Sequence, residues 1–194
     1  MGKLVFNYGV MSSSKSTQLL VFAYNLEQQG KSILCLKPSV DTRNSNIESR
    51  LGVSREAVGI SAENDIYEYV DLLLEKGRNV DVILVDEIQF FTEKHIEQLK
   101  NIVDDFDIEV RCYGLKNSFV EGELFDPIKR LLYEADELIE TESSCEFCNK
   151  KATHHLRIVN GKTIRTGNAV NVGDTKKDND YYIVCCRKHY YKHK

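Results

Sequence analysis

The stretch Leu4-Val5-Phe6-Asn7-Tyr8 runs directly into Gly9-Val10-Met11-Ser12-Ser13-Ser14-Lys15-Ser16-Thr17, and this passage decides the fold. The first five residues form an apolar run typical of a buried strand. The next nine nearly match a phosphate-binding loop, which requires glycine, four residues, glycine, lysine and then serine or threonine. Lys15 and Ser16 stand at the required spacing, but Ser14 occupies the place of the second glycine. The passage predicts a strand, a phosphate-binding loop and a helix.

Such a loop binds phosphate by pointing backbone N–H groups and a helix N-terminus at the anion. The lysine reaches the β- and γ-phosphates, and the hydroxyl that follows it binds Mg²⁺. At Ser14, either φ is negative and serine is accommodated, or its Cβ opens the loop slightly. A polar turn with a chance lysine is the alternative interpretation of the motif. The candidate phosphate-binding residues of the loop are Gly9, Met11, Ser12, Ser13, Ser14, Lys15, Ser16 and Thr17.

Composition indicates an ordinary soluble protein. A chain of 194 residues, with 42% hydrophobic and 29% charged residues, suits one sizeable domain with a small appendage. The net charge of −4 argues against a general nucleic-acid binder. No apolar run approaches the length of a membrane span, and the N-terminus lacks the layout of a signal peptide. Six cysteines without a secretion signal suggest metal or buried thiols, so we expect a cytoplasmic protein.

The first 140 or so residues alternate between strand-like and helix-like segments. The expected strands are 3–8, 32–36, 82–85, 108–113 and 137–141, and the expected helices are 15–29, 65–76, 92–106 and 127–135. Alternation of this kind predicts βαβ crossovers and a mostly parallel sheet flanked by helices. The fold class is therefore α/β, of the P-loop (RecA-like) type.

Two stretches lack this alternation, and the composition changes near the C-terminus. Residues 37–60 and 114–125 show no clear period and are expected to be long, functional loops. From residue 143 the chain turns to cysteines, histidines and short β segments. We expect a P-loop nucleotide-binding domain over 1–142 and a zinc-binding β lobe over 143–194.

A second phosphate signature follows the apolar strand 82–85, where Asp86 and Glu87 stand at its end. Ligands of open α/β sheets bind at that edge, and an aspartate there holds Mg²⁺ in P-loop enzymes. Glu87 can then face the acceptor and orient or deprotonate its hydroxyl. Two solvated acids at a strand end are the alternative. Phe90 and Phe91 either pack in the core or form a wall for a planar base, which would imply a nucleoside acceptor.

The metal signature is specific. Cys145-x-x-Cys148 and Cys186-x-x-His189 supply three thiolates and one imidazole, the set of a closed structural zinc site. Zinc would order a lobe whose apolar content is too low for a core of its own. Cys185 is a rival ligand, but its side chain should lie on the opposite face of a strand from that of Cys186.

The remaining cysteines and histidines have no assigned chemistry. Cys35 and Cys112 lie in apolar strands and should be inert core residues. His154 and His155 should lie on the surface of a β segment, and His95 on an exposed helix face.

Taken together, these motifs resemble those of the type II thymidine kinases, the zinc-containing family found in bacteria, some viruses and animals. The resemblance covers essentially the whole chain. It rests on Lys15-Ser16-Thr17, Asp41-Thr42-Arg43, Asp86-Glu87-Ile88-Gln89-Phe90-Phe91, Tyr113-Gly114-Leu115, Gly122-Glu123-Leu124-Phe125 and Cys186-Arg187-Lys188-His189-Tyr190.

The resemblance implies ATP-dependent phosphorylation of the 5′-hydroxyl of thymidine in nucleotide salvage. Lys15 would bind the phosphates, Ser16 and Asp86 would hold Mg²⁺, and Glu87 would be the general base. Arg43 would lie near the transferring phosphate and, with Asp41, near the acceptor.

The resemblance also implies a set of nucleoside contacts. Segment 160–180, tied at both ends by zinc, would be a lasso-like lid that closes over thymidine. The substrate-binding residues would be Met11, Asp41, Arg43, Gln89, Phe90, Leu115, Phe119, Phe125, Asn171, Val172 and Tyr182. Asn171 and Val172 would hold the base through their backbone, and Tyr182 would contact the sugar. The family forms tetramers and is inhibited by thymidine triphosphate, and neither nucleic acid nor a membrane is an expected partner.

The chain departs from the family pattern at Ser12 and Ser14 in the loop, in a longer 118–122 segment, and at Gly173-Asp174 in the lasso. Two alternatives stay open on sequence grounds: a deoxynucleoside kinase with a shifted base preference, and a nucleotide-binding relative weakened catalytically by Ser14. A zinc-ribbon module for nucleic acid is disfavoured by the acidic charge.

Overall fold

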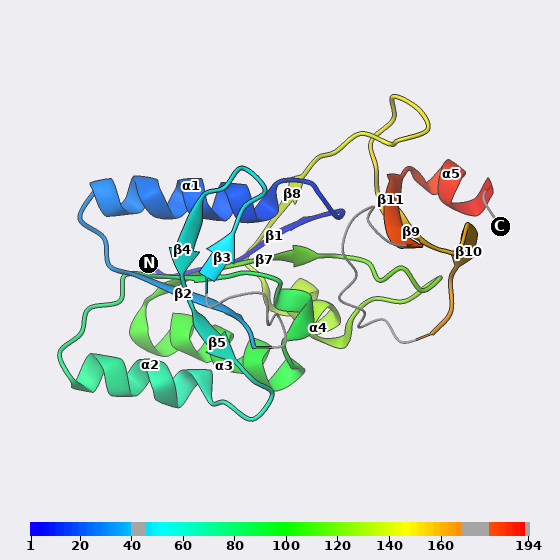
Figure 1. The fold of residues 1–194 in the computed structure, drawn as a ribbon. Coiled ribbons are helices and arrows are strands. Elements are labelled where there is room, and N and C mark those ends of the chain that lie inside the picture. Colours follow the sequence, from blue (N-terminus) through cyan, green and yellow to red (C-terminus); the bar gives the residue numbers. More distant parts are fainter. Residues whose placement is uncertain (40–45, 168–178, 193–194) are drawn as a thin grey trace.

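The computed structural model describes residues 1–39, 46–167 and 179–192 (Figure 1). The main sheet contains β1 (Leu4–Gly9), β2 (Ile33–Pro38), β5 (Val58–Ile60), β6 (Val82–Val85), β7 (Glu109–Leu115) and β8 (Glu137–Thr141). The helices are α1 (Lys15–Gln28), α2 (Ile66–Glu75), α3 (Glu93–Phe106), α4 (Asp126–Glu134) and α5 (Arg187–Lys192), with a 3₁₀ turn, η1 (Ile88–Phe90). The expected alternation of strands and helices over the first 140 residues is confirmed.

The order of the main sheet determines where the site lies. Its strands run β5-β2-β6-β7-β1-β8, and all adjacent pairs are parallel. Because parallel strands end at the same edge, the carboxyl ends of β1, β6 and β7 lie beside one another. The phosphate-binding loop follows β1, and the two acids follow β6. The sheet therefore brings the two phosphate signatures together.

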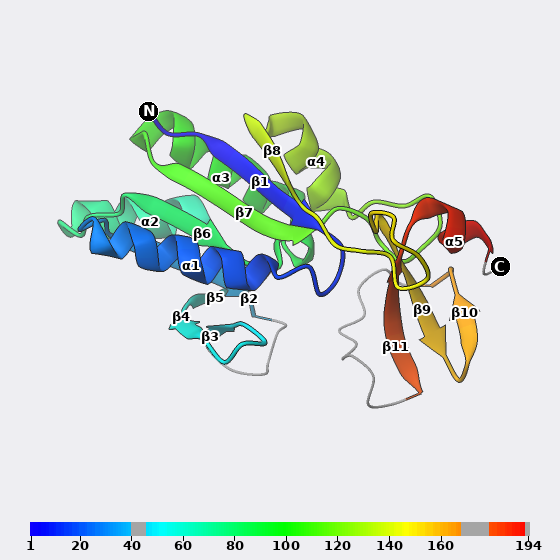
Figure 2. The same cartoon turned by 90° about the horizontal axis from the view of Figure 1, so that it is seen from above.

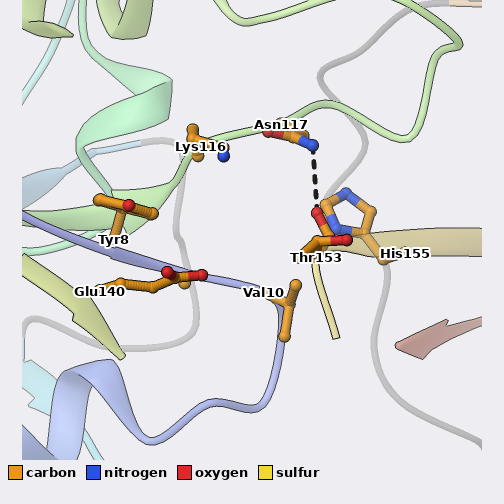
Figure 3. A pocket seen from close by; sticks show the side chains of 8 residues that line it. Tyr8, Val10, Lys116, Asn117, Glu140, Thr153 and His155 are labelled. Atoms are coloured by element: carbon orange, nitrogen blue, oxygen red, sulfur yellow. Dashed lines mark hydrogen bonds between the residues drawn. The ribbon is translucent and has the colours of Figure 1, made fainter. Parts of the chain in front are cut away.

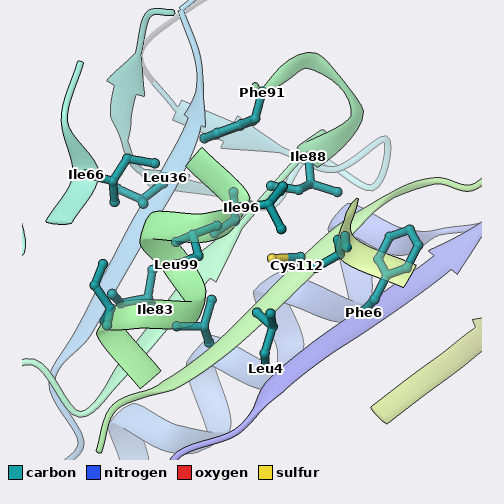
Figure 4. Packing of buried hydrophobic residues seen from close by; sticks show 14 of the residues in the cluster. Leu4, Phe6, Leu36, Ile66, Ile83, Ile88, Phe91, Ile96, Leu99 and Cys112 are labelled. Atoms are coloured by element: carbon teal, nitrogen blue, oxygen red, sulfur yellow. The ribbon is translucent and has the colours of Figure 1, made fainter. Parts of the chain in front are cut away.

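Helices cover both faces of this sheet. α1 lies on one face, and α2, α3 and α4 lie on the other (Figures 1 and 2). The larger core fills the three-helix face, where Leu4 and Phe6 of β1 pack with Ile96 and Leu99 of α3 (Figure 4). Burial of each such side chain stabilises the fold by about 1.5–3 kcal/mol. Cys35 and Cys112 are buried in the two cores, as expected.

The N-terminus of α3 corrects one expectation. Thr92 caps the helix, but His95 is 1% exposed and does not lie on a solvated face. Its Nδ1 accepts from the Thr92 N–H at 3.2 Å, its Nε2 lies 3.0 Å from the Asn64 carbonyl, and its ring packs edge-on against Phe91. The helical period places His95 on the helix but does not show that the loop before α2 covers it.

The expectation of an irregular loop over 37–60 is wrong in part. Beyond β2, β3 (Asn46–Glu48) and β4 (Ser54–Glu56) form an antiparallel hairpin, and Ile47 packs beside α1. β5 adds a parallel edge strand to β2. Each of these strands has three residues, which is too short to give a detectable period.

The C-terminal lobe is a small antiparallel sheet, ordered β10-β9-β11, with α5 beside it. Its strands are β9 (His154–Val159), β10 (Lys162–Ile164) and β11 (Asp180–Cys185). The lobe lies beyond the carboxyl edge of the main sheet (Figure 2). The division between domains at residue 142 stays an interpretation. In the described parts of the chain, no helix has the length and apolar content needed to cross a membrane.

Candidate active site

Lys15 is held inside the phosphate-binding loop. Its Nζ donates to the Val10 carbonyl at 2.8 Å and lies 3.4 Å from the Ser13 Oγ. Burial lowers the pKa of the Lys15 ammonium, and the nearby Glu87 and Asp86 carboxylates oppose that shift. The lysine of the loop and the two acids after β6 are therefore close enough to interact electrostatically.

Ser14 adopts the conformation that the loop motif reserves for glycine. Its φ is 64°, in the left-handed region, and Ser12 has a φ of 58°. Of the two alternatives, a negative φ at Ser14 is therefore wrong. A side chain in this region costs about 1–2 kcal/mol relative to glycine. As the N-cap of α1, Ser14 makes no side-chain capping hydrogen bond among the described residues that would offset this cost.

Gly9 allows the end of β1, the end of β8 and Ser13 of the loop to approach one another closely. A Cβ on Gly9 would lie 2.8 Å from the Thr141 carbonyl oxygen at the end of β8, and would also clash with the Ser13 Oγ. Glycine at this position is therefore required for close backbone approach.

The predicted magnesium ligands lie together. The Ser16 hydroxyl is near enough to the Asp86 carboxylate, buried at the end of β6, to lower the pKa of that carboxyl. Burial first, and then the Glu87 charge, raise the pKa of Asp86 to about 7. A buried carboxylate beside a serine hydroxyl supplies the hard oxygen donors that Mg²⁺ prefers. These two residues fit a magnesium ion held together with nucleotide phosphates.

Glu87 is oriented by its own chain. Its φ of 49° places it in the left-handed region, and its N–H donates to the Asp86 Oδ1 at 3.0 Å. Its carboxylate accepts from the Gln89 Nε2. The buried Gln89 accepts in turn from the Leu115 N–H at 2.9 Å, so both ends of its amide contact the protein. Backbone strain of this kind is characteristic of functional sites.

Gly114 makes this arrangement sterically accessible. A Cβ there would lie 2.5 Å from the Gln89 Oε1 and 2.7 Å from the Ile88 Cγ2. Sequence reasoning noted Gly114 only within a motif and gave it no role. The sequence places Gly114 at the start of the expected 114–125 loop, but β7 (Glu109–Leu115) extends through it, and a glycine inside a strand marks close approach by another segment.

The two adjacent phenylalanines have different environments. Phe91 is buried in the main core, so of the two interpretations, core packing or a wall for a planar base, core packing holds for Phe91. Phe90 is half-buried and faces Phe125 edge-on, with ring centroids 6.3 Å apart. Phe90 is thus the member of the pair that can border a bound base.

Other predicted wall residues gather around Met11. This half-buried side chain packs against the cluster of Phe119, Val120 and Tyr182, and also against the main core that contains Leu115 and Phe125. The rings of Phe119 and Tyr182 meet edge-on at 6.1 Å. Met11 therefore joins the wall residues of the main domain to those of the lobe.

Several predicted site residues lie outside the described residues. These are Asp41 and Arg43 in 40–45, and Asn171, Val172 and the Gly173-Asp174 pair in 168–178. Their roles stay predictions.

All four predicted zinc ligands meet in the C-terminal lobe. The ligand atoms of Cys145, Cys148, Cys186 and His189 all lie within 4.8 Å of one another. The Cys148 and Cys186 sulfurs are 3.9 Å apart, and the His189 Nδ1 is 3.4 Å from the Cys145 Sγ. A tetrahedral zinc ion separates such ligands by about 3.5–3.8 Å. The donor set and its spacing therefore fit zinc.

The neighbouring thiols behave differently. Burial opposes ionisation of Cys145, but the backbone N–H groups of Cys186 and Phe147 and the His189 ring outweigh it and lower the pKa of that thiol to about 6. Burial raises the pKa of Cys185 to about 12, and Cys185 packs in the small core of the lobe. Its exclusion from the ligand set is confirmed for the described residues.

The expectation for the paired histidines is wrong. His155 is 3% exposed, and His154 is half-buried, with its ring 4.7 Å from that of Tyr190. The cause is tertiary: Ala152 and Val184 of the lobe pack on Val10 of the phosphate-binding loop. His155, paired with Val184, is thereby enclosed between the lobe and the loop.

Comparison with known proteins agrees with this geometry. The family model described as thymidine kinase matches residues 2–190. The chain belongs to the thymidine kinase family. It is 40% identical to the thymidine kinase of Streptococcus agalactiae serotype Ia over 193 residues, covering 98% of each chain. It is also 40% identical to that of Lactococcus lactis subsp. lactis over 194 residues, covering 99% of this chain and 98% of the relative.

A third relative, the thymidine kinase of Streptococcus gordonii, is 39% identical over 194 residues, covering 99% of this chain and 97% of the relative. Such matches over nearly the full length include both the loop and the zinc lobe, so the family assignment does not rest on one motif. The family expected from the sequence is confirmed.

Proposed function

We propose that this protein transfers the γ-phosphoryl group of ATP to the 5′-hydroxyl of thymidine, giving thymidine monophosphate. The observation that carries the proposal is the meeting of Lys15, the Ser16–Asp86 pair and Glu87 at adjacent strand ends. Family membership supports the substrates.

Phosphate binding follows from the loop. Lys15 would exchange the Val10 carbonyl for the β- and γ-phosphate oxygens, with the loop N–H groups completing the cradle. Ser16 and Asp86 would hold Mg²⁺, which supplies charge neutralisation to the transferring phosphoryl group. Arg43 would approach the same phosphate.

Proton transfer is assigned to Glu87. As the 5′-oxygen attacks the γ-phosphorus, its proton passes to the Glu87 carboxylate and the bond to the ADP oxygen breaks. Gln89 holds this carboxylate from one side and is itself fixed by the Leu115 N–H. Gln89 would therefore serve the substrate mainly by orienting Glu87.

Nucleoside binding is assigned to the wall around Met11. Phe90 and Phe125 would border the base, and Phe119 and Tyr182 would close the side of the lobe. Asp41 would approach the acceptor, and Asn171 and Val172 would hold the base through their backbone. Closure of segment 160–180 would keep water from the reacting phosphate.

The wider setting is also proposed. The protein would act in the cytoplasm, in nucleotide salvage, as a homotetramer inhibited by thymidine triphosphate. Zinc would have a structural role, since three thiolates and one imidazole leave no open position for a substrate.

A Glu87→Gln variant tests the assignment of the base. Gln preserves the size of the side chain but cannot accept a proton, so we expect kcat to fall at least 100-fold while the dissociation constant for thymidine changes less than about threefold. Glu97→Gln, on the exposed face of α3, is the matched control and should retain full turnover. Near-normal kcat in Glu87→Gln would remove the general-base role. A purified wild-type protein that phosphorylates no deoxynucleoside would overturn the proposed function.

A further inference from the structure

His155 is a buried polar residue that the proposed reaction does not use. Its Nδ1 has no hydrogen-bond partner within the described residues, although the side chain is 3% exposed. An unpaired buried polar atom costs about 1–3 kcal/mol, so such atoms are uncommon without a partner that arrives from elsewhere.

A polar cavity lies on one side of the His155 ring. The cavity opens between the end of β1 and the lobe and is small: the space that the centres of water molecules can occupy is about 10 Å³, close to the minimum for one water. Figure 3 shows His155 beside Thr153, whose carbonyl accepts from the Asn117 Nδ2 at 3.2 Å. The Asn117 Oδ1 is buried and unpartnered in the described structure. Two unsatisfied polar atoms thus belong to residues that line one cavity.

The His155 ring also contacts the proposed nucleoside wall. His155 meets the Tyr182 ring edge-on, with centroids 5.9 Å apart, and Tyr182 packs against Phe119. Met11 also packs against the cluster of Val10, Ala152 and Val184, where the lobe meets the phosphate-binding loop. Val184 is the strand partner of His155. The imidazole therefore contacts both the polar cavity and the wall assigned to the nucleoside.

His155 is present as the neutral imidazole. Burial lowers its pKa to about 3, and the fields of Lys15 and His154 act in the same direction. A neutral imidazole has one N–H donor and one lone-pair acceptor. It can therefore match a carbonyl or a ring N–H, and it adds no positive charge beside Lys15.

We propose that His155 is a specificity-determining residue that hydrogen-bonds the polar edge of the pyrimidine base, directly or through one water in this cavity. The inference rests on the proposed function. Because the 5′-hydroxyl must lie at Glu87 for transfer, the base is the part of the nucleoside left to the lobe. A site built to pair a polar group discriminates strongly against bases that mismatch it.

Three variants test the role of Nδ1. His155→Leu removes both ring nitrogens, His155→Asn keeps a polar atom near the position of Nδ1, and His155→Gln places one near that of Nε2. In the leucine variant we expect the KM for thymidine to rise about 3- to 10-fold, the range for one hydrogen bond. The KM for ATP should stay within about twofold. Asparagine should restore more of the thymidine affinity than glutamine.

A panel of bases separates hydrogen bonding from packing. Deoxycytidine differs from thymidine at the polar edge and also lacks the methyl group, whereas deoxyuridine lacks only the methyl group. We expect His155→Leu to reduce the preference for thymidine over deoxycytidine and to leave the preference over deoxyuridine unchanged. An equal change in both comparisons would show that His155 acts by shape on the methyl group, and would overturn the inference.

His154→Leu is the matched control, because it removes an imidazole from the adjacent position of β9, where the ring packs on Tyr190. Its KM for thymidine should stay within about twofold of wild type. Equal losses in both variants, or lost zinc and a lowered melting temperature in His155→Asn, would assign His155 a structural role. An active wild type with an unaltered KM in His155→Leu would overturn the inference and leave the proposed function intact.

Discussion

Ser14 is the position at which a departure from the phosphate-binding motif strains the backbone. It carries a side chain at a φ of 64°, where the motif has glycine. Ser14→Gly should relieve about 1–2 kcal/mol of backbone strain in the folded state. Glycine also increases the conformational entropy of the unfolded chain, which lowers the free energy of unfolding by up to about 1 kcal/mol and offsets part of this gain. Since the loop N–H groups must converge on phosphate, we also expect kcat/KM for ATP to rise a few-fold in steady-state assays.

Ser12→Gly is the control for this prediction, because Ser12 has a φ of 58° but does not occupy the position of the motif glycine. It should show a similar gain in the free energy of unfolding, with a smaller change in kcat/KM for ATP than Ser14→Gly shows. If Ser14→Gly leaves kcat/KM for ATP unchanged or lower, serine is accommodated there without a catalytic penalty.

His155 should make the stability of the protein depend on pH. Its pKa is about 3 in the folded state and about 6.5 in an unfolded chain, so below pH 6.5 the unfolded state binds a proton that the folded state does not. Folding stability is therefore lost as the pH falls. Between pH 7 and pH 5, wild type should lose about 2 kcal/mol more than His155→Asn in urea unfolding. Parallel pH profiles for the two proteins would contradict this.

At the scale of elements, the packing of η1 against β7 positions Glu87. Gly114→Ala would place a methyl group 2.5 Å from the Gln89 Oε1 and force η1 outward. We expect kcat to fall at least 10-fold, with a smaller effect on the KM for ATP, because Gln89 then holds Glu87 incorrectly.

Gly59→Ala, in β5, is the matched control for Gly114→Ala. A Cβ on Gly59 meets only Ser39 atoms at 3.7 and 3.8 Å, an ordinary contact distance. Its kcat should be that of wild type. Equal activity of the two alanine variants would show that the close approach at Gly114 has no bearing on Glu87.

The elements that the sequence predicted well are those with long periodic patterns. α3 and β6 begin and end within a residue of their expected bounds, because each has a continuous apolar face or run. The hairpin of β3 and β4 is too short for such a pattern. His95 and His155 were misplaced for a different reason: their burial depends on segments distant in sequence, which local periodicity does not reveal.

At the scale of the whole molecule, the zinc lobe and the phosphate-binding loop should be thermodynamically linked. Val10, whose carbonyl holds Lys15, packs on Ala152 and Val184 of the lobe. Because zinc binding is coupled to folding of such a lobe, chelation should unfold it. We expect thymidine binding to be lost and the affinity for ATP to fall about 3- to 10-fold, as one or two buried contacts are lost.

Calorimetry on zinc-depleted protein, with metal content verified by atomic absorption, measures both affinities. Restoring zinc should restore both, which separates a reversible loss from aggregation. Unchanged thymidine affinity after verified depletion would refute the structural role of the metal, and an unchanged ATP affinity alone would refute the linkage.

The position of β1 has a consequence for how the protein is made. This first strand is flanked by β7 and β8. The strand partner of Leu4 is Val110 and that of Val5 is Glu137, so neither pairing can form until these later residues have been synthesised. A ribosome adds about 5–20 residues per second, so the nascent strand stays unpaired for several seconds while its apolar side chains are exposed. Contacts this distant along the chain also slow folding. Pairing of β1, and with it the ordering of the phosphate-binding loop, therefore cannot begin before β7 has been synthesised.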